Sequence, residues 1–372
     1  MALNCIAGLD IGHKEIKLTL CEVDENHDVN VLSSSSSVTS GLEKGKIVDQ
    51  DALTGAIKSA IMRAKKNNKF EIRSIISTLP LFMAKFSTNS GFIHLNDTEE
   101  IEQSHVDSCI KRAKNIVQNP DIMAAHILPI EYRINGEIVD DPVGKKGQNL
   151  EVLCHFVFSS KSELQTLMSI LKTLNLTVNG IIYGPIATAK TIFNDIELNE
   201  GAGLIDIGKN FTKVSYFKKG TLIRGTIIPI GTETYIKDLS LVLKIPTSKA
   251  VDYLSENKTP PLPLANDIIH ARHAELSSFI KKAFNGCDPL DTKIALVGGG
   301  IHIKKIRHHL AKQLDINTFH KMPQNILSIL PSEKYVTSVG LILKGLSSNC
   351  IESHHSGTTL KTKVLKWFLD FF

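Results

Sequence analysis

Short apolar runs that end at glycine alternate along this chain with longer amphipathic stretches. Residues 5–10 form an apolar run, and residues 16–23 alternate apolar with polar positions, so both predict β-strands joined by a tight turn. From residue 51 to 67 the apolar positions recur at helical spacing, and Asp49 or Asp51 is available as the N-cap. Strand and helix signals in this order predict a mixed α/β fold.

The same two periodicities continue to the end of the chain. Strands are predicted over 74–78, 126–132, 150–158, 178–183, 203–208, 214–217 and 294–297, and helices over 96–118, 161–174, 185–194 and 268–284. Residues from about 84 to 158 look like an inserted unit. Residues 347–359 are rich in Ser, His, Gly and Thr, which indicates a flexible linker.

The opening pattern of the chain returns near its middle. Residues 8–12 read GLDIG, residues 203–208 read GLIDIG, and each segment is followed by a predicted returning strand. A strand, an Asp-x-Gly turn and a second strand thus occur twice. This internal duplication predicts two related lobes that face each other across a cleft.

Three glycine loops carry the candidate chemistry. An aspartate at a strand end can hold hydrated Mg²⁺, and a glycine two residues later lets the main chain approach a phosphate closely. The third loop follows a strand, so its bare backbone could lie against adenine or ribose. The sequence has no Walker-type loop and no Rossmann fingerprint. The candidate magnesium ligands, through water, are Asp10 and Asp206, and the candidate nucleotide-binding residues are Gly12, His13, Lys14, Gly208, Lys209, Asn210, Gly298, Gly299 and Gly300.

The order and separation of these loops resemble the phosphate-1, phosphate-2 and adenosine loops of the actin, Hsp70 and sugar-kinase superfamily. Within it, the chain resembles the bacterial FtsA family over nearly its whole length. The segments that carry this resemblance are 41–49 (GLEKGKIVD), 126–132 (HILPIEY), 141–144 (DPVG), 228–231 (IPIG) and 338–341 (SVGL). The segments at 126–132 and 141–144 are the most discriminating, because they resemble the inserted 1C subdomain of that family.

The resemblance implies an actin-like (ribonuclease H-like, duplicated) two-lobed α/β fold with an inserted 1C subdomain. The expected division is lobe 1 (1A) at 1–85, 159–195 and 335–346, 1C at 86–158, lobe 2 (2A) at 196–228 and 286–334, 2B at 229–285, a linker at 347–359 and a terminal helix at 360–372.

The family resemblance also implies a function. A protein of this kind would bind ATP with Mg²⁺, form filaments of itself, and anchor the tubulin-like FtsZ ring to the cytoplasmic face of the bacterial inner membrane at the division site. The 2B-type region, about 229–285, would bind the FtsZ C-terminal tail, and 1C would contact other division proteins. The nucleotide would then serve as a conformational ligand more than as a substrate.

Two departures from the family pattern bear on the nucleotide. His13 stands where the family usually has Thr, and residues 206–212 read DIGKNFT where the family reads Asp-x-Gly-Gly-Gly-Thr-Thr. The loss of two glycines removes positions on which close phosphate approach depends. Lys209 could compensate by reaching a phosphate oxygen, or it could be a solvated surface lysine. No general base for hydrolysis can be named, so at most a weak ATPase is expected.

The last thirteen residues are apolar on one helical face. Trp367 and Phe368 lie on this face, and the segment is too short to span a bilayer, so it predicts a helix that lies in the membrane interface. At the same spacing a core helix is the alternative. The candidate membrane-binding residues are Lys363, Val364, Leu365, Lys366, Trp367, Phe368, Leu369, Phe371 and Phe372.

Composition limits the remaining possibilities. The formal net charge of +5 suits an anionic lipid surface or an acidic partner, and the basic residues form no block that would demand nucleic acid. Six scattered cysteines predict reduced thiols of a cytoplasmic protein. Two alternatives stay open. One is an actin-like pilus-assembly scaffold, and the other is a small-molecule kinase of the same superfamily, which would need a catalytic aspartate.

Overall fold

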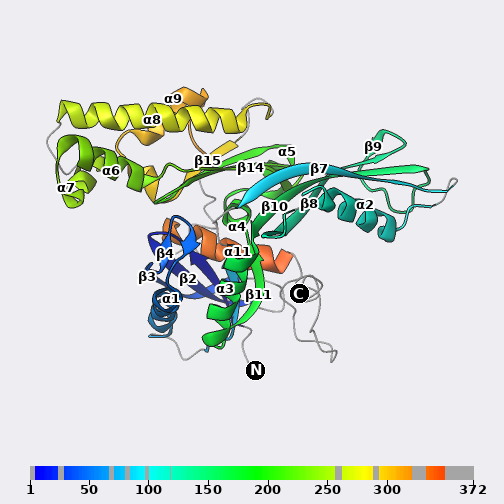
Figure 1. The fold of residues 1–372 in the computed structure, drawn as a ribbon, viewed down its shortest axis with the longest axis horizontal. Coiled ribbons are helices and arrows are strands. Elements are labelled where there is room, and N and C mark those ends of the chain that lie inside the picture. The colour runs from blue at the N-terminus through cyan, green and yellow to red at the C-terminus, as the bar shows by residue number, and fades with distance from the viewer. Residues whose placement is uncertain are drawn as a thin grey trace.

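The computed structural model has two α/β lobes and a third sheet that extends to one side of them (Figure 1). The structure describes residues 5–23, 29–66, 71–79, 84–96, 100–117, 119–255, 262–287, 293–320 and 332–347. The predicted α/β class is confirmed. The predicted linker, apart from its first residue, and the predicted membrane-binding helix lie outside the described residues.

Lobe 1 is built on a five-stranded mixed sheet. The strand order is β11 (Thr177–Ile182), β6 (Ser74–Thr78), β1 (Cys5–Ile11), β2 (Glu15–Val23) and β3 (Val29–Val38). The first three strands are parallel, and β1, β2 and β3 pair antiparallel. The helices of this lobe are α1 (Gln50–Lys65), α3 (Lys161–Thr173), α4 (Gly184–Ile192) and α11 (Val336–Ser347), and a small ribbon joins β4 (Leu42–Glu43) to β5 (Lys46–Ile47). The short helix α5 (Asp195–Glu200), which follows α4 in the chain, packs instead against the sheet of lobe 2.

The serine run at 33–37 forms the middle of β3, which the apolar pattern alone does not indicate. Alternate serines face α1, where each hydroxyl donates to the carbonyl of an alanine one helical turn from the next. The three bonds join Ser33 to Ala64 at 2.9 Å, Ser35 to Ala60 at 2.7 Å and Ser37 to Ala56 at 2.7 Å. Every second residue of the strand thus meets every fourth residue of the helix, because these residues lie on the facing sides of the two elements. The small side chains of serine and alanine let the strand and the helix approach closely enough for these hydrogen bonds.

Lobe 2 repeats the core of lobe 1. Its sheet has the order β14 (Thr221–Ile228), β13 (Thr212–Lys218), β12 (Ala202–Ile207) and β15 (Lys293–Val297). β12 pairs antiparallel with β13 and parallel with β15, as β1 pairs with β2 and with β6. The predicted duplication is therefore present in the sheet topology. The helices of this lobe are α6 (Thr232–Leu243), α7 (Thr247–Leu254), α8 (Pro263–Phe284), α9 (Ile306–Leu314) and the 3-10 helix η1 (Gly299–His302).

The inserted unit is a separate sheet with its own core. Its strand order is β7 (Lys85–His94), β10 (Asn149–Ser160), β8 (Ile122–Ile134) and β9 (Glu137–Val139), and α2 (Gln103–Asn115) covers one face. Gly91 allows this packing, because a Cβ there would overlap the Cys109 backbone of α2. At the base, Phe86 packs edge-on against Tyr183 of lobe 1 and beside the bare Gly225 of lobe 2. The insertion therefore contacts both lobes.

The first strand and the last described helix, α11, meet in the core of lobe 1. α11 lies against β1 so closely that a Cβ on Gly8 would overlap the Ser338 carbonyl, and Ser338 shares a buried 2.7 Å hydrogen bond with Thr19 of β2. The 3-10 turn η2 (Glu333–Tyr335) leads into this helix. Two predicted boundaries were wrong. α2 is shorter than the predicted 96–118, and α8 begins at Pro263 because proline fits the first turn of a helix.

Candidate functional site

A cleft of about 1010 Å³ lies between the two lobes, and both Asp-x-Gly turns open into it. Seven of the predicted nucleotide-binding residues line this cleft, together with Asp10 and Asp206. The seven are Gly12, His13, Lys14, Gly208, Lys209, Gly298 and Gly299. Asn210 and Gly300 do not line it. The volume is at the upper end of what ligand pockets usually have, so the cleft has room for a nucleotide.

Both Asp-x-Gly turns have the same hydrogen bond. The Gly12 amide donates to the Glu15 carbonyl at 3.2 Å, and the Gly208 amide donates to the Phe211 carbonyl at 2.9 Å. A Cβ on Gly12 would lie 2.7 Å from the oxygen that accepts this bond. Gly12 is therefore required by the turn itself, because a side chain would push the returning strand away. Other backbone groups of the two loops must provide any contact with a ligand.

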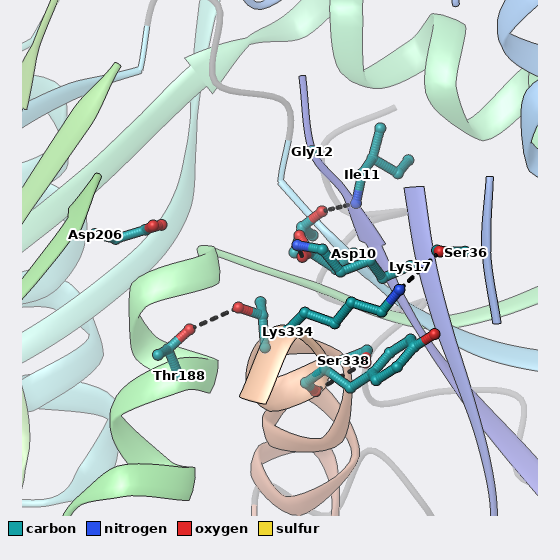
Figure 2. Close-up of polar contacts among 12 residues, drawn as sticks. Asp10, Ile11, Gly12, Lys17, Ser36, Thr188, Asp206, Lys334 and Ser338 are labelled. Carbon is teal, nitrogen blue, oxygen red and sulfur yellow. Dashed lines mark hydrogen bonds and ion pairs between the residues drawn. The ribbon is translucent and has the colours of Figure 1, made fainter. Parts of the chain in front are cut away.

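Each aspartate is paired with a lysine on the returning strand. Asp10 and Lys17 are register partners between β1 and β2, and Oδ2 of Asp10 lies 3.2 Å from Nζ of Lys17. Asp206 and Lys213 are register partners between β12 and β13, with the corresponding atoms 2.8 Å apart. All four side chains are less than a quarter exposed. In Figure 2 the two carboxylates extend toward each other from opposite sides of the cleft.

The ionisation of Lys17 reflects both aspartates. Burial alone would lower the pKa of Lys17, but the negative charges of Asp10 and then of Asp206 outweigh that effect and raise its pKa above the ordinary value. The carboxylate of lobe 2 therefore acts on an ammonium group of lobe 1. This link across the cleft holds Lys17 in its charged form.

The third glycine loop, residues 298–300, packs closely on β12 and also has an open backbone surface toward the cleft. Gly298 has φ of 91°, and a Cβ there would overlap Asp206 and the Ile207 carbonyl. A Cβ on Gly300 would overlap the Ile207 side chain, whereas a Cβ on Gly299 would meet nothing within 4 Å. Two of the glycines thus let the loop pack on β12, and Gly299 leaves its bare side open to the cleft.

His13 and Phe211 meet between the two turns. Their rings are in edge-to-face contact with centroids 5.3 Å apart. Burial, followed by the charges of Lys213 and Lys209, lowers the pKa of His13 to about 4, so the ring is neutral near pH 7. Its Nε2 is buried without a hydrogen-bond partner among the described residues. An uncharged ring pair therefore bridges the lobes beside the charged groups.

Lys17 and Lys213 were missed by the motif search, although the sequence contains a signal for them. Each lies seven residues after its aspartate, so both halves read Asp-Ile-Gly followed by four residues and Lys. In a hairpin with this turn, position seven lies directly opposite the aspartate. The recognised repeat ends at the glycine of each turn, so it does not include the two lysines that follow.

The residues present fit a polyphosphate better than a divalent cation. The described lining of the cleft has six basic and four acidic side chains. Mg²⁺ is usually held by one or two carboxylates together with phosphates. Here an ammonium group already bonds one oxygen of each carboxylate. A surplus of positive charge and an open glycine backbone are instead typical of an anion site.

The described ranges hold neither a membrane-spanning helix nor a cluster of metal ligands. No helix there is long and apolar enough to cross a bilayer. No group of three or more His, Cys, Asp or Glu side chains there is arranged to hold a metal ion, and this includes the adjacent pair His308 and His309. His309 instead shares a hydrogen bond with Ser277 of α8.

Comparison with known proteins identifies the inserted unit. Residues 84–158 match the family model described as the SHS2 domain inserted in FTSA. This range agrees with the predicted insertion at 86–158 to within two residues at its start, and it contains the sheet β7-β10-β8-β9.

Curated relatives agree over most of the chain. The cell division protein FtsA of Streptococcus pneumoniae is 30% identical over 239 residues, which are 64% of this chain and 52% of that protein. FtsA of Pseudomonas aeruginosa is 23% identical over 375 residues, covering 92% of this chain and 89% of that protein. The chain thus spans about half the length of the first relative and most of the second.

Solved structures share the fold. The PilM-PilN type IV pilus biogenesis complex superposes with a TM-score of 0.70 at 14% identity, covering 92% of this chain and 98% of the other. MreB5 of Spiroplasma citri bound to AMPPNP gives 0.54 at 11% identity, covering 93% and 98%. These structures show an actin-like fold. Together with the inserted SHS2 domain, they confirm the predicted actin-like fold with an inserted subdomain, and the chain is similar over most of its length to cell division proteins FtsA.

Proposed function

We propose that this protein is an ATP-binding, actin-like cell-division protein that polymerises and links the FtsZ ring to the cytoplasmic face of the bacterial inner membrane. The observation that carries the proposal is the SHS2 domain, because it occurs at residues 84–158 within an actin-like lobe and its family model is the one inserted in FTSA. The fold alone would be compatible with many functions. The inserted domain supports this one.

ATP is the proposed ligand of the interlobe cleft. The support comes from the two turns that face each other, the basic surplus of the lining and the open backbone at Gly299. The related fold of MreB5 binds AMPPNP, an ATP analogue. Calorimetric titration of the full chain with ATP tests this assignment. Absence of heat and of any thermal stabilisation by ATP would contradict it.

The 2B region is the proposed site for the FtsZ C-terminal tail. Several exposed large apolar side chains lie in its described helices, and they include Leu241, Val242, Val251, Leu264 and Phe279. Exposed apolar groups of this size are frequent at docking surfaces. Leu241, on α6, is 79% exposed, so its replacement should not disturb the core.

Fluorescence anisotropy with a labelled FtsZ tail peptide tests the docking site. We expect Leu241→Asp to weaken binding by roughly tenfold, because a charge on the docking surface must be desolvated. Val38→Asp is the matched control, since Val38 is 76% exposed but lies in lobe 1. Equal affinity of the Leu241→Asp variant and the wild type would move the site away from α6.

Residues 360–372 are the proposed membrane anchor, and self-association would multiply a weak single contact. Cosedimentation with anionic liposomes tests the anchor by comparing the full chain with a chain that ends at Lys363. We expect most of the lipid-bound fraction to be lost. Trp367→Glu is a milder variant for the same test, and Lys58→Glu, on exposed α1, is its control. Unchanged lipid binding by the truncated chain would refute the anchor.

A pilus-assembly scaffold is the second candidate, because the fold superposes well on the PilM-PilN complex. The same anisotropy experiment separates the two candidates when a peptide from the PilN component is used beside the FtsZ tail. Preference for the FtsZ tail supports the division role. Preference for the PilN peptide would replace it.

A further inference from the structure

The strongest unassigned feature of the cleft is the repeated pairing of an aspartate with a lysine. Lys17 and Lys213 occupy equivalent positions in the two lobes, opposite Asp10 and Asp206. Their ammonium groups lie 3.2 and 2.8 Å from the carboxylates. This arrangement occurs on both sides of one cleft, so it is a feature of the site and not a single surface ion pair.

The pairing determines which cations the carboxylates can accept. A metal ion bound through water to Asp10 or Asp206 would lie within a few ångströms of an ammonium nitrogen, and like charges at that distance repel strongly in a half-buried site. All four side chains are less than a quarter exposed, so the lysines have little room to move into solvent. A divalent cation at either carboxylate would therefore have to displace the lysine paired with it.

The same lysines are suitably placed for an anion. Each ammonium group has three donors, and only one contact to a carboxylate is needed to hold it at the cleft. Lys14 and Lys209 add charge from the turns, and the described lining has more basic than acidic groups. Lysine is a common point-charge partner of phosphate. The charge that a metal usually supplies to a triphosphate is thus already present on the protein.

We propose that the cleft binds the polyphosphate of a nucleotide without a divalent cation, with the ammonium groups of Lys17 and Lys213 in the position that a bound metal would otherwise take. This rests on the proposed nucleotide-binding function. It replaces the magnesium site predicted at Asp10 and Asp206 by a positioning role, in which each carboxylate holds its lysine toward the cleft.

Calorimetric titration of the full chain with ATP, once in excess magnesium chloride and once in excess EDTA, tests the proposal. The affinity of the wild type should differ by less than about threefold between the two conditions. A loss of more than about tenfold in EDTA would overturn metal independence and leave nucleotide binding intact. Failure to bind ATP in either buffer would overturn the nucleotide function as well, so the two failures are distinguishable.

Variants of the two lysines test whether their ammonium groups bind the polyphosphate. Lys17→Met with Lys213→Met should weaken ATP binding in EDTA by at least about tenfold and make the remaining binding depend on Mg²⁺, because the freed carboxylates can then hold the metal. Lys58→Met, on the exposed face of α1, is the control for loss of a lysine.

The substitution Asp206→Asn should change ATP affinity in opposite directions in a site without a divalent cation and in a site that holds one. In excess magnesium chloride it should leave ATP affinity unchanged or raise it severalfold, because the variant removes a negative charge and keeps a hydrogen-bond acceptor for Lys213. In a metal site the same change would weaken binding. A weaker Asp206→Asn variant would therefore contradict the proposal even if the lysine variants fail to fold, and its circular dichroism spectrum confirms that it is folded.

Discussion

The two hairpins that face the cleft have the same internal geometry, but different elements hold their loops in place. In lobe 1 the loop is tied to its own sheet, because Thr39 donates its hydroxyl to the Gly12 carbonyl at 2.6 Å and Thr78 accepts from the Ile11 amide at 2.9 Å. In lobe 2 the loop is tied to α6, whose first amides at Thr232 and Glu233 donate to the carbonyls of residues 208 and 209.

This difference suggests that the two loops have different mechanical roles. The lobe 1 loop is hydrogen-bonded to residues of its own lobe. The lobe 2 loop continues through hydrogen bonds into the first turn of α6, the helix with the exposed Leu241. A ligand that shifts the second loop would therefore shift the 2B helices. The nucleotide and the partner peptide would then be coupled through one helix terminus.

The largest effects that would test this difference between the two hairpins are expected at the end of the strand beside each of them. We expect Gly298→Ala to lower the free energy of unfolding by about 2 to 4 kcal/mol, because its φ is positive and a Cβ would overlap Asp206. Gly299→Ala is the matched control and should change stability by less than about 0.5 kcal/mol. Urea denaturation measures both, and equal effects would mean that the loop does not pack on β12 as described.

In lobe 1 the corresponding strand is β6, which ends at Thr78. Thr78→Val keeps the shape and removes the acceptor for the Ile11 amide, so we expect a loss of about 1 to 3 kcal/mol. The effect should be confined to lobe 1. Hydrogen exchange should therefore become faster in β1 and not in β12, and uniform acceleration would argue against separate supports.

Acid should weaken lobe 2 through His273, which is completely buried between α6 and α9. Burial is the main cause that lowers its pKa to about 4 from 6.5. The unfolded chain therefore binds the proton first, and stability is lost as the pH falls from 6.5 toward 4. His273→Gln should reduce this loss by about 1 to 2 kcal/mol in denaturation measured across that pH window. Exposed His308→Gln is the control, and identical slopes would exclude His273 as the cause.

The support of the second loop by α6 can be loosened at Gly231. A Cβ there would lie 2.7 Å from the Gly208 carbonyl and would push the loop toward the cleft. We expect Gly231→Ala to cost about 1 to 2 kcal/mol of stability and to weaken binding of the FtsZ tail peptide together with ATP. Gly55→Ala, at an open helix position, should be neutral or stabilising. Unchanged binding of both ligands would separate the loop from α6.

The smallest expected effect concerns the ring contact that joins the two loops. A double-mutant cycle with His13→Ala and Phe211→Ala should give a coupling energy of about 0.5 to 1.5 kcal/mol. Thermal unfolding of the four chains measures it. A coupling energy of zero would mean that the lobes are held apart in solution and the rings do not meet.

The sequence alone determined the elements whose pattern is local. The strands around residues 5–10 and 203–208, the helix after Asp49 and the Asp-x-Gly turns follow from hydrophobic period, capping and glycine, each within a few residues. The duplication and the inserted unit were also readable, because they repeat or interrupt those patterns. The resemblance to FtsA rested on such segments.

Only the tertiary structure decided what these elements contact. Serines at 33–37 gave no strand signal, since their polar hydroxyls are satisfied by carbonyls of α1 that lie far away in sequence. The sequence pattern also did not reveal that Gly298 must be bare because Asp206 lies against it, or that the charge of Asp206 acts on Lys17 across the cleft. Local period fixes which face of a strand a residue occupies, but pairing across a cleft depends on how the lobes pack, and that is a long-range property.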